Sequence, residues 1–553
     1  MQATKDLPGS ICNVARFLPE AALNYPELCA VRAPKSSFLG GPPAYLEKSF
    51  IELERESNAV GYYLASIGIV RNTKVLLMVR PGLNLINITF ALFKLGAIPI
   101  IIDPGMGLRN FLSCVEQIQP EALVGIPVAI LLSKAYPNTF SSVKIRVNIK
   151  QAAFGNAPAR FQQRELAQAQ TQSDDLAAIL FTSGSTGPPK GVTYQHGNFE
   201  AQVALIRSQY KIQPGEVDLP MLPIFALFNP AMAMTTVIPQ MNPSKPAKVN
   251  PARIVRAIQE NRVTNSFGSP ALWTRIGRYC TTHKILLPSI RRILIAGAPA
   301  TPTLLRMLEP IFPNGTIHTP YGATESLPVS TISSKTVLHD TCHQTEQGKG
   351  TCVGNLFPKI EVGIIQITDQ VISDWSPSLS VKSGDIGEIV VKGPTVTSTY
   401  YGMPAATELA KIPAGDGFWH RMGDLGYFDA SGRLWFCGRK AERVVCADGT
   451  VLYTDCCEGI LNQHPDVLRS ALIGLGQWGQ HIPAIVIEPE KNCRLSRSQL
   501  IESVKAFAKN FPLLKPIQTF LIHHTFPVDV RHNAKIHRLS LKKIFEYKMR
   551  NQL

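Results

Sequence analysis

Apolar residues recur along the first 150 positions with two alternating periods. Residues 49–67 and 84–95 carry apolar side chains at helical spacing, whereas residues 74–79 and 98–102 are short, almost continuous apolar runs. Short apolar runs between helical patterns are typical of parallel strands that are buried on both faces. Similar runs return further along the chain, at residues 263–267, 292–295 and 316–318. The pattern predicts an α/β fold in which crossover helices join parallel strands.

The pattern changes near residue 384, where short runs separated by turn residues predict antiparallel strands at 387–393 and 432–436. We expect a large N-terminal domain over residues 1–438, made of βαβ subdomains with a small β-barrel-like part. A small C-terminal α+β domain is expected over residues 439–553, and the family resemblance described below implies that it is mobile. Its predicted elements are strands at 468–475, 482–487 and 519–522, a helix at 496–511 and a basic helix at 535–550.

Composition narrows the class of protein. The chain has 553 residues, enough for three or four structural units at ~150 residues each. Hydrophobic residues make up 45%, and this much apolar surface excludes a disordered chain. Lys and Arg total 56 against 40 Asp and Glu, a net charge of +16. That excess fits a nucleic acid, a membrane surface or an anionic substrate, and composition does not choose among them.

The cysteines and the N-terminus point to the cytoplasm. The 11 cysteines are irregularly spaced without a CxxC pair, which fits free thiols better than a disulfide framework or a zinc ribbon. Residues 1–19 contain charged side chains and no long apolar core, so they do not resemble a signal peptide. The most apolar run, residues 90–102, is interrupted by Lys94 and is too short to cross a bilayer.

The strongest local motif spans residues 181–191, Phe-Thr-Ser-Gly-Ser-Thr-Gly-Pro-Pro-Lys-Gly, directly after a strand-like run. Glycines and small hydroxyl residues expose backbone N–H groups to phosphate oxygens, and Lys190 adds a positive charge. The motif is not a Walker A loop, because Pro189 stands where that loop requires glycine. From the residues alone, it is either a phosphate-binding loop or a flexible Ser/Gly turn.

The order of residues in this loop resembles the phosphate-binding loop of the adenylate-forming (acyl-AMP) ligases. Four further segments resemble motifs of that family and follow in the family's order, at residues 296–299, 321–325, 423–426 and 438–439. Each alone has an ordinary structural explanation, such as a core tyrosine or a turn aspartate. Their common order along most of the chain argues against coincidence.

The resemblance implies which residues carry the chemistry. Lys535 aligns with the family's catalytic lysine, although Ala534 replaces the usual preceding glycine. Its cation would stabilise charge in the adenylation transition state. Thr324 would contact the α-phosphate, and Glu325 would hold Mg²⁺. The implied catalytic residues are therefore Lys535, Thr324 and Glu325, and the implied metal ligand is Glu325.

The resemblance also implies an ATP site. Tyr321 would stack on adenine, Asp424 would receive the ribose hydroxyls, and Arg439 would lie near the ribose and phosphate. The nucleotide-binding residues implied in this way are Thr182, Ser183, Gly184, Ser185, Thr186, Gly187, Lys190, Gly297, Ala298, Pro299, Tyr321, Gly322, Ala323, Asp424 and Arg439.

Residues around the motifs resemble one branch of the family, the ATP-dependent β-lactone synthetases of long-chain olefin biosynthesis. The branch implies that a 2-alkyl-3-hydroxy fatty acid becomes an acyl-AMP, whose 3-hydroxyl closes a lactone ring and expels AMP. It also implies a thiolase-like enzyme, a reductase and a decarboxylase as pathway partners. The alternative within the family is a fatty-acyl-CoA synthetase, which would use CoA. The segments concerned are 102–107, 223–228, 318–329 and 531–536.

Two interpretations from other classes are weaker. A nucleic-acid-binding protein would explain the charge, but no recognisable nucleic-acid-binding motif is present. A catalytically dead scaffold is disfavoured because the motif residues Lys190, Glu325, Asp424, Arg439 and Lys535 are intact.

Four features have two interpretations each. The apolar segment 223–234 either lines an acyl tunnel or packs in the core. His196 and His318 are general-base candidates or structural histidines. The basic segment 535–550 is a solvated face or a peripheral membrane contact. Relatives usually carry an acidic residue where this chain has Ala441, so the domain rotation that the family uses is either retained or reduced.

Overall fold

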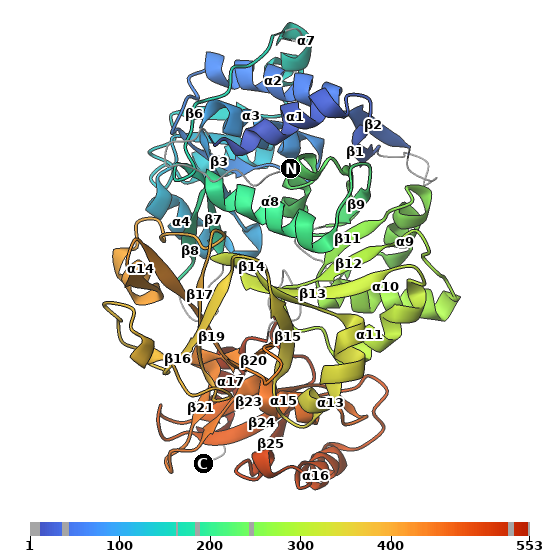
Figure 1. The fold of residues 1–553 in the computed structure, drawn as a ribbon, viewed down its shortest axis with the longest axis vertical. Coiled ribbons are helices and arrows are strands. Elements are labelled where there is room, and N and C mark those ends of the chain that lie inside the picture. The colour runs from blue at the N-terminus through green and yellow to red at the C-terminus, as the bar shows by residue number, and fades with distance from the viewer. Residues whose placement is uncertain are drawn as a thin grey trace.

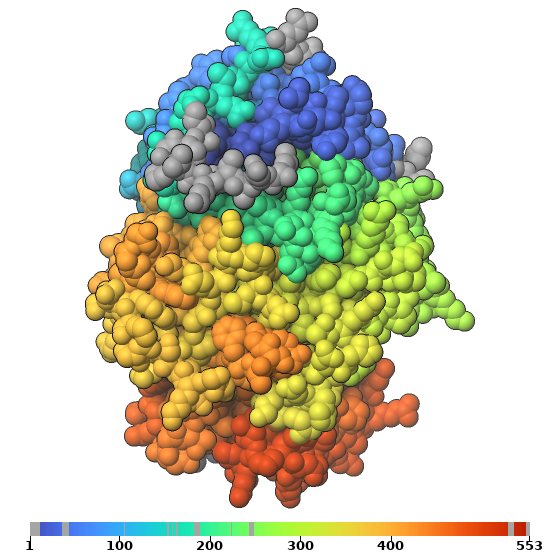
Figure 2. All heavy atoms as spheres, viewed as in Figure 1, coloured from blue at the N-terminus to red at the C-terminus, as the bar shows by residue number. Residues whose placement is uncertain are grey.

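The computed structural model describes residues 12–35, 44–161, 164–182, 188–242, 248–528 and 536–550. Its elements form two α/β units, an antiparallel region and a small C-terminal unit. Figure 1 shows the first unit at the top in blue, strands β13–β15 near the centre, and the C-terminal elements in orange and red at the bottom. The space-filling view shows the C-terminal residues forming the base of the molecule (Figure 2).

The first unit is a sheet of six strands in the order β6-β5-β3-β4-β7-β8. All neighbours are parallel except β7 and β8. Val75 packs toward α2 and α3, and its neighbour Leu76 packs toward α4, so both faces of the sheet are buried. Its elements are β3 (Lys74–Met78), β4 (Ile98–Ile102), β5 (Ala122–Gly125), β6 (Ile145–Asn148), β7 (Leu176–Thr182), β8 (Lys190–Gln195), α2 (Phe50–Ser66), α3 (Leu83–Leu95), α4 (Leu108–Ile118), α5 (Pro127–Ala135), α6 (Ala152–Gly155) and α7 (Ala157–Phe161).

The second unit is the parallel part of a 14-stranded sheet, in which β10, β9, β11, β12 and β13 are successive neighbours. Its core is formed with helices α9–α11. Strands β1 and β2 extend its far edge, and α1 and α8 also belong to the N-terminal part of the chain. The bounds are α1 (Phe17–Asn24), β1 (Cys29–Pro34), β2 (Tyr45–Ser49), α8 (His196–Tyr210), β9 (Val217–Pro220), β10 (Thr235–Val237), α9 (Pro251–Glu260), β11 (Asn265–Gly268), α10 (Pro270–His283), β12 (Arg292–Ile295), α11 (Pro302–Leu308) and β13 (Thr316–Ala323).

The same sheet continues as antiparallel strands from β14 to β16. The expectation of a barrel-like part needs correction, because this region is an open sheet among the described residues and does not close on itself. Its elements are β14 (Ser326–Ser333), α12 (Ser334–Thr336), α13 (Cys342–Glu346), β15 (Thr351–Leu356), β16 (Glu361–Ile365), β17 (Gly387–Lys392), α14 (Pro404–Ala410), β18 (Lys411–Ala414), β19 (Gly417–Phe428) and β20 (Leu434–Arg439).

The C-terminal elements have their own hydrophobic cores. Helices α15 and α16 pack on the sheet β23-β24-β25, and α17 packs on its other face around Leu541 and Phe545. Helix α15 also contacts β20 and α13 of the preceding part. The bounds are β21 (Val444–Val445), β22 (Val451–Leu452), α15 (Thr454–Leu461), β23 (Val467–Leu475), β24 (Ile482–Pro489), α16 (Arg497–Ala508), β25 (Thr519–Ile522) and α17 (Arg538–Arg550).

Three of the predicted elements that differ in extent show why the bounds change. The strand predicted at 316–318 continues to Ala323, because β14 pairs with it antiparallel and Tyr321 lies opposite Ser330. The strand predicted at 432–436 begins at Leu434, because residues 429–432 form a turn closed by the Gly432 N–H and the Asp429 carbonyl. The helix predicted at 496–511 ends at Ala508, before the next turn begins at Pro512.

Among the described residues, none of the helices combines the length and apolar character that a membrane span requires. All 11 cysteines lie in the described residues, and none of them forms a disulfide. Cys437 of β20 and Cys456 of α15 are both buried, and interaction with Cys456 raises the pKa of Cys437.

Candidate active site

Three predicted site residues, one each from β13, β19 and β20, contact one another through their side chains. The Tyr321 hydroxyl donates a hydrogen bond of 2.7 Å to Asp424 Oδ2, and Arg439 Nε lies 3.1 Å from Asp424 Oδ1. Asp424 and Arg439 are cross-strand partners. The Asp424 carboxylate is buried, and its charge raises the pKa of Arg439. Burial and the same carboxylate raise the pKa of Tyr321 well above its usual value.

Gly438 lets Arg439 reach this site. Its backbone has a φ of +131°, which side-chain-bearing residues rarely adopt. A Cβ there would also lie 2.1 Å from Thr454 Oγ1 at the start of α15. Glycine is therefore required for the close approach of β20 and the C-terminal elements.

A second group forms around the turn between β13 and β14. Tyr400 O–H donates a 2.8 Å hydrogen bond to Glu325 Oε1. The Thr397 N–H donates to the Glu325 carbonyl at 2.9 Å. Lys190 Nζ, at the start of β8, lies 4.6 Å from the centre of the Tyr400 ring. These contacts bring two predicted phosphate- and metal-binding residues to one tyrosine, Glu325 at its hydroxyl and Lys190 over its ring.

The remaining described site residues lie near these two groups. Thr324 precedes Glu325, and the Thr324 carbonyl accepts a hydrogen bond from the Tyr194 hydroxyl. Gly297, Ala298 and Pro299 follow β12, which is the parallel neighbour of β13, so this turn lies alongside the end of β13. Gly322 and Ala323 belong to β13 itself.

Several predicted residues cannot be placed. Ser183, Gly184, Ser185, Thr186, Gly187 and Lys535 lie outside the described residues, as does the side chain of Thr182. Their flanks are described. The backbone of Thr182 pairs with Lys190, and Val528 forms a bridge with Ile536. The roles of these residues therefore stay predictions.

The two histidines make contacts typical of structural residues. His196 Nδ1 accepts the Val14 N–H at 3.1 Å, and burial lowers its pKa to about 4. The His318 ring lies 5.1 Å from the Tyr210 ring. Burial, together with Arg292, lowers the pKa of His318 to about 4.

The apolar segment 223–234 forms two 3₁₀ turns, η3 (Pro223–Leu227) and η4 (Pro230–Met232), rather than an α-helix. Phe225 stacks on Phe267 with ring centres 3.9 Å apart. Phe225 and Phe228 are partly buried against the same apolar cluster as Tyr321. The segment thus packs in the core next to the predicted nucleotide site.

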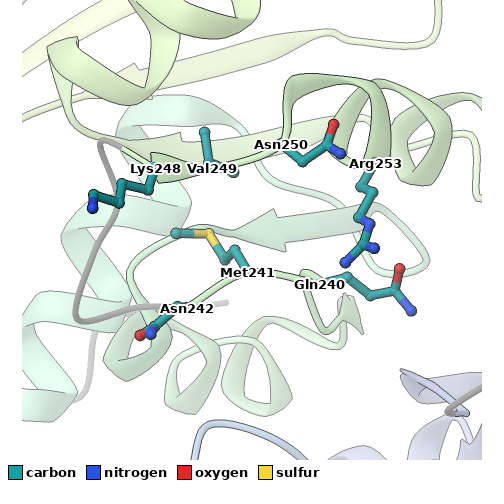
Figure 3. A pocket seen from close by; sticks show the side chains of 7 residues that line it. All are labelled: Gln240, Met241, Asn242, Lys248, Val249, Asn250 and Arg253. Atoms are coloured by element: carbon teal, nitrogen blue, oxygen red, sulfur yellow. The ribbon is translucent and has the colours of Figure 1, made fainter.

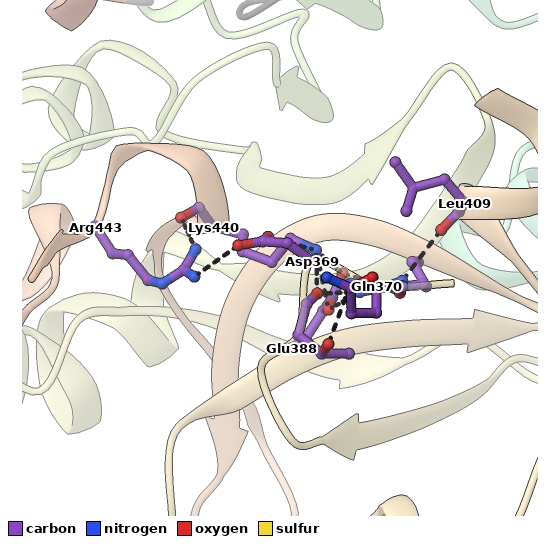
Figure 4. A network of polar contacts seen from close by, with 8 residues as sticks. Asp369, Gln370, Glu388, Leu409, Lys440 and Arg443 are labelled. Atoms are coloured by element: carbon purple, nitrogen blue, oxygen red, sulfur yellow. Dashed lines mark hydrogen bonds and ion pairs between the residues drawn. The ribbon is translucent and has the colours of Figure 1, made fainter. Parts of the chain in front are cut away.

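A network of ion pairs surrounds the start of the C-terminal part (Figure 4). Lys440 Nζ lies 3.1 Å from Glu388 Oε1 and 3.5 Å from Asp369 Oδ1. Glu388 is buried and also pairs with Arg421 at 2.7 Å. Arg443 Nη2 pairs with Asp369 Oδ2 at 3.2 Å. Lys440 and Arg443, on either side of Ala441, are therefore tied to the preceding part of the chain.

Sequence patterns give no signal for Tyr400 or Glu388. Tyr400 belongs to no spacing motif, and Glu388 looks like an ordinary polar position of a strand. Only the fold places Tyr400 against β8 and buries Glu388.

A surface hollow of about 400 Å³ lies away from these groups (Figure 3). It is lined by residues 240–242, 248–250 and 253, and it contains none of the predicted site residues.

The comparisons identify the family. The profile of the AMP-binding enzyme family matches residues 20–401. The chain belongs to this family. It is an adenylate-forming ligase, and members of this family use ATP.

Two relatives match almost the whole chain. It is 42% identical over 545 residues to the olefin β-lactone synthetase of Xanthomonas campestris pv. campestris, covering 96% of this chain and 97% of that protein. It is 41% identical to the olefin β-lactone synthetase of Stenotrophomonas maltophilia, with the same coverage. The crystal structure of ATP-bound MatB from Rhodopseudomonas palustris has a similar fold. The TM-score is 0.78 at 20% identity, covering 97% of this chain and 99% of that one.

Proposed function

We propose that this protein converts a 2-alkyl-3-hydroxy fatty acid to a β-lactone through an acyl-AMP. The main support is its similarity to two olefin β-lactone synthetases over almost their whole length. The joined Tyr321, Asp424 and Arg439 side chains give further support, because they form a charged and aromatic surface suited to an adenosine.

The reaction has two steps. A carboxylate oxygen of the substrate attacks the α-phosphorus of ATP, the bond to the β-phosphate bridge oxygen breaks, and pyrophosphate leaves. The 3-hydroxyl oxygen then attacks the acyl carbon and loses its proton to solvent or a base, and the bond to AMP breaks. Because the nucleophile belongs to the same molecule, proximity supplies much of the acceleration.

In this proposal, Tyr321 stacks on adenine beside the turn formed by Gly297, Ala298 and Pro299. Asp424 receives the ribose hydroxyls, and Arg439 lies near the ribose and phosphate. Lys190, the loop at residues 182–187 and Thr324 bind phosphates. Lys535 supplies the cation that stabilises the transition state.

Glu325 is the proposed Mg²⁺ ligand. Magnesium prefers carboxylate oxygens and usually completes its shell with phosphate oxygens and water. Glu325 is partly exposed and offers such oxygens. The described residues contain no group of three or more His, Cys, Asp or Glu able to hold a metal by themselves. This fits a metal that arrives with nucleotide and offsets phosphate charge.

Product analysis tests this function against the CoA-ligase alternative. The protein is incubated with ATP, Mg²⁺ and a 2-alkyl-3-hydroxy fatty acid, with and without CoA, and the products are measured by mass spectrometry. We expect AMP and lactone in equal amounts without CoA. AMP release that strictly requires CoA and yields a thioester would contradict the lactone function and favour the alternative.

We also propose that the chain divides into domains at residues 1–438 and 439–553. The separate cores of the C-terminal elements support this boundary. The ion pairs of Lys440 and Arg443 support reduced rotation between the domains, which suits a second step that needs no second substrate.

Further proposals concern the acyl chain, the pathway partners and the location of the protein. We propose that the segment at 223–234 contacts the acyl chain, and that a thiolase-like enzyme and a reductase supply the substrate while a decarboxylase consumes the lactone. The absence of disulfides among the 11 cysteines, all of which are described, supports a cytoplasmic location.

Helix α17 exposes Lys543 and Tyr547, which supports peripheral contact with an anionic membrane. Sedimentation with anionic and neutral vesicles tests this contact.

A further inference from the structure

Tyr400 lies where three distant parts of the chain meet. It forms an antiparallel bridge with Val192 of β8. On either side of it, the Thr193 N–H donates to the Thr399 carbonyl at 3.2 Å and the Tyr401 N–H donates to the Gly191 carbonyl at 2.7 Å. The Tyr400 side chain is only 6% exposed. Its position is therefore fixed by the backbone on both sides.

The Tyr400 side chain makes two different contacts with the proposed ATP site. Its O–H donates to Glu325 Oε1 at 2.8 Å, and the face of its ring receives Lys190 Nζ at 4.6 Å from the ring centre. A hydrogen bond to a carboxylate is stronger than one between neutral groups. An aromatic face attracts an ammonium group through its quadrupole. One side chain thus holds an anion at its tip and a cation on its ring.

The surroundings make Tyr400 a dependable donor. The Tyr400 hydroxyl is buried and donates to the Glu325 carboxylate. Thr397, whose N–H donates to the Glu325 carbonyl, accepts a hydrogen bond from Lys411 at its own carbonyl.

We propose that Tyr400 is a positioning residue that fixes the separation between Lys190 and Glu325. The inference rests on the proposed function, in which Lys190 meets the phosphates and Glu325 the metal. Because one tyrosine holds both groups in place, the Lys190 ammonium and the Glu325 carboxylate do not have to be ordered when they bind the triphosphate. Loss of the hydroxyl affects Glu325 alone, whereas loss of the ring affects both.

The test measures binding of a non-hydrolysable ATP analogue by calorimetry over a range of Mg²⁺ concentrations, in variants Tyr400→Phe and Tyr400→Leu. We expect Tyr400→Phe to raise the Mg²⁺ concentration for half-maximal binding by about tenfold and to leave metal-free binding unchanged. Tyr400→Leu should also weaken metal-free binding, because Lys190 loses the ring.

Tyr401→Phe is the matched control. The Tyr401 hydroxyl accepts from Lys74 Nζ at 3.2 Å, and no contact with Glu325 or Lys190 is recorded for it. A Mg²⁺ requirement of Tyr400→Phe equal to that of Tyr401→Phe would overturn the proposal. If Tyr400→Leu does not fold, Tyr400→Phe, which keeps the ring, carries the test. Failure of the unmodified protein to bind the analogue would instead overturn the proposed function.

Discussion

The hydroxyl of Tyr321 is hydrogen-bonded to the carboxylate of Asp424 across 103 residues of sequence, at a distance of 2.7 Å. This bond and the pair with Arg439 use one oxygen of Asp424 each. The carboxylate is therefore held in a fixed orientation before any ligand arrives.

Replacing Tyr321 by Phe should weaken ATP binding while leaving the chemical step almost intact. The ring that would stack on adenine remains, but Asp424 loses the hydrogen bond from the Tyr321 hydroxyl. We expect KM for ATP to rise by about three- to tenfold, equivalent to roughly 1 kcal/mol for one hydrogen bond, with kcat little changed. Substrate-dependent exchange of pyrophosphate into ATP provides the measurement. Tyr427→Phe, whose hydroxyl donates to the Lys349 carbonyl, is the control, and equal effects of the two changes would contradict the assignment.

Replacing Lys535 by Ala should slow formation of the acyl-AMP. An electrostatic contribution of this kind is typically worth a factor of about 10² to 10³. Pyrophosphate release in a single turnover measures it directly. Lys543 is an exposed lysine on the nearby helix α17, so Lys543→Ala controls for the loss of positive charge. An unchanged rate in Lys535→Ala would remove this residue from the mechanism.

Replacing Lys440 by Ala should loosen the start of the C-terminal part without unfolding either part. Glu388 keeps its pair with Arg421, so the buried carboxylate stays compensated. We expect faster hydrogen exchange at residues 440–445, because Lys440 loses its charged contacts with Glu388 and Asp369. The lactone-forming rate should stay within about threefold of that of the unmodified protein, because this step needs no second substrate. A large slowing confined to the lactone-forming step would show that rotation about this hinge is required.

Lys94 should make stability rise with pH in the alkaline range. It is fully buried beside Glu54, and burial lowers its pKa from 10.5 to about 8. Between these values the unfolded chain binds more protons than the folded one, so stability increases as pH rises through that window. The gain is about 3 kcal/mol at most. Below pH 8 both states are protonated, and the full cost of burying the charge is present.

This effect is measured as the difference in melting temperature between the unmodified protein and the Lys94→Met variant, which has no titratable group at this position. The difference should move in favour of the unmodified protein between pH 8 and pH 10.5. The matched control is Lys134→Met, at an exposed lysine of α5. The same pH dependence in both variants would contradict the assignment.

Sequence patterns located most of the fold because its strands are apolar runs. Strand β12 was predicted at its observed bounds, and α2, α3 and β4 to within a residue or two. Strand β19 escaped prediction because it carries His420, Arg421 and Asp424, which do not form an apolar run. Those polar residues are stabilised by tertiary partners, such as Glu388 for Arg421, that lie far away in sequence.

The candidate site likewise contains residues that sequence motifs predict and a residue that only tertiary contacts reveal. Tyr321, Asp424 and Arg439 were predicted to share a site from motif order, and their direct contacts confirm that they lie together. Their roles toward ATP stay predictions. Tyr400 has no motif, because its importance depends on the bridge between residues 192 and 400. A pattern of local spacing cannot reveal a contact that forms only when two sheets meet.

The segment around Tyr400 also bears on how the protein matures. Its hydrogen bonds to β8 join residues 206 positions apart, and the pair of Asp424 and Arg439 is synthesised later still. A partly made chain on the ribosome therefore lacks part of the proposed nucleotide site, even when its first sheet is already folded. Once the chain is finished, ATP binds the native state selectively and stabilises it by mass action, by about 2.7 kcal/mol at a hundredfold excess over Kd. The cell's ATP supply thereby becomes a factor in the lifetime of the finished protein, separate from its role as a reactant.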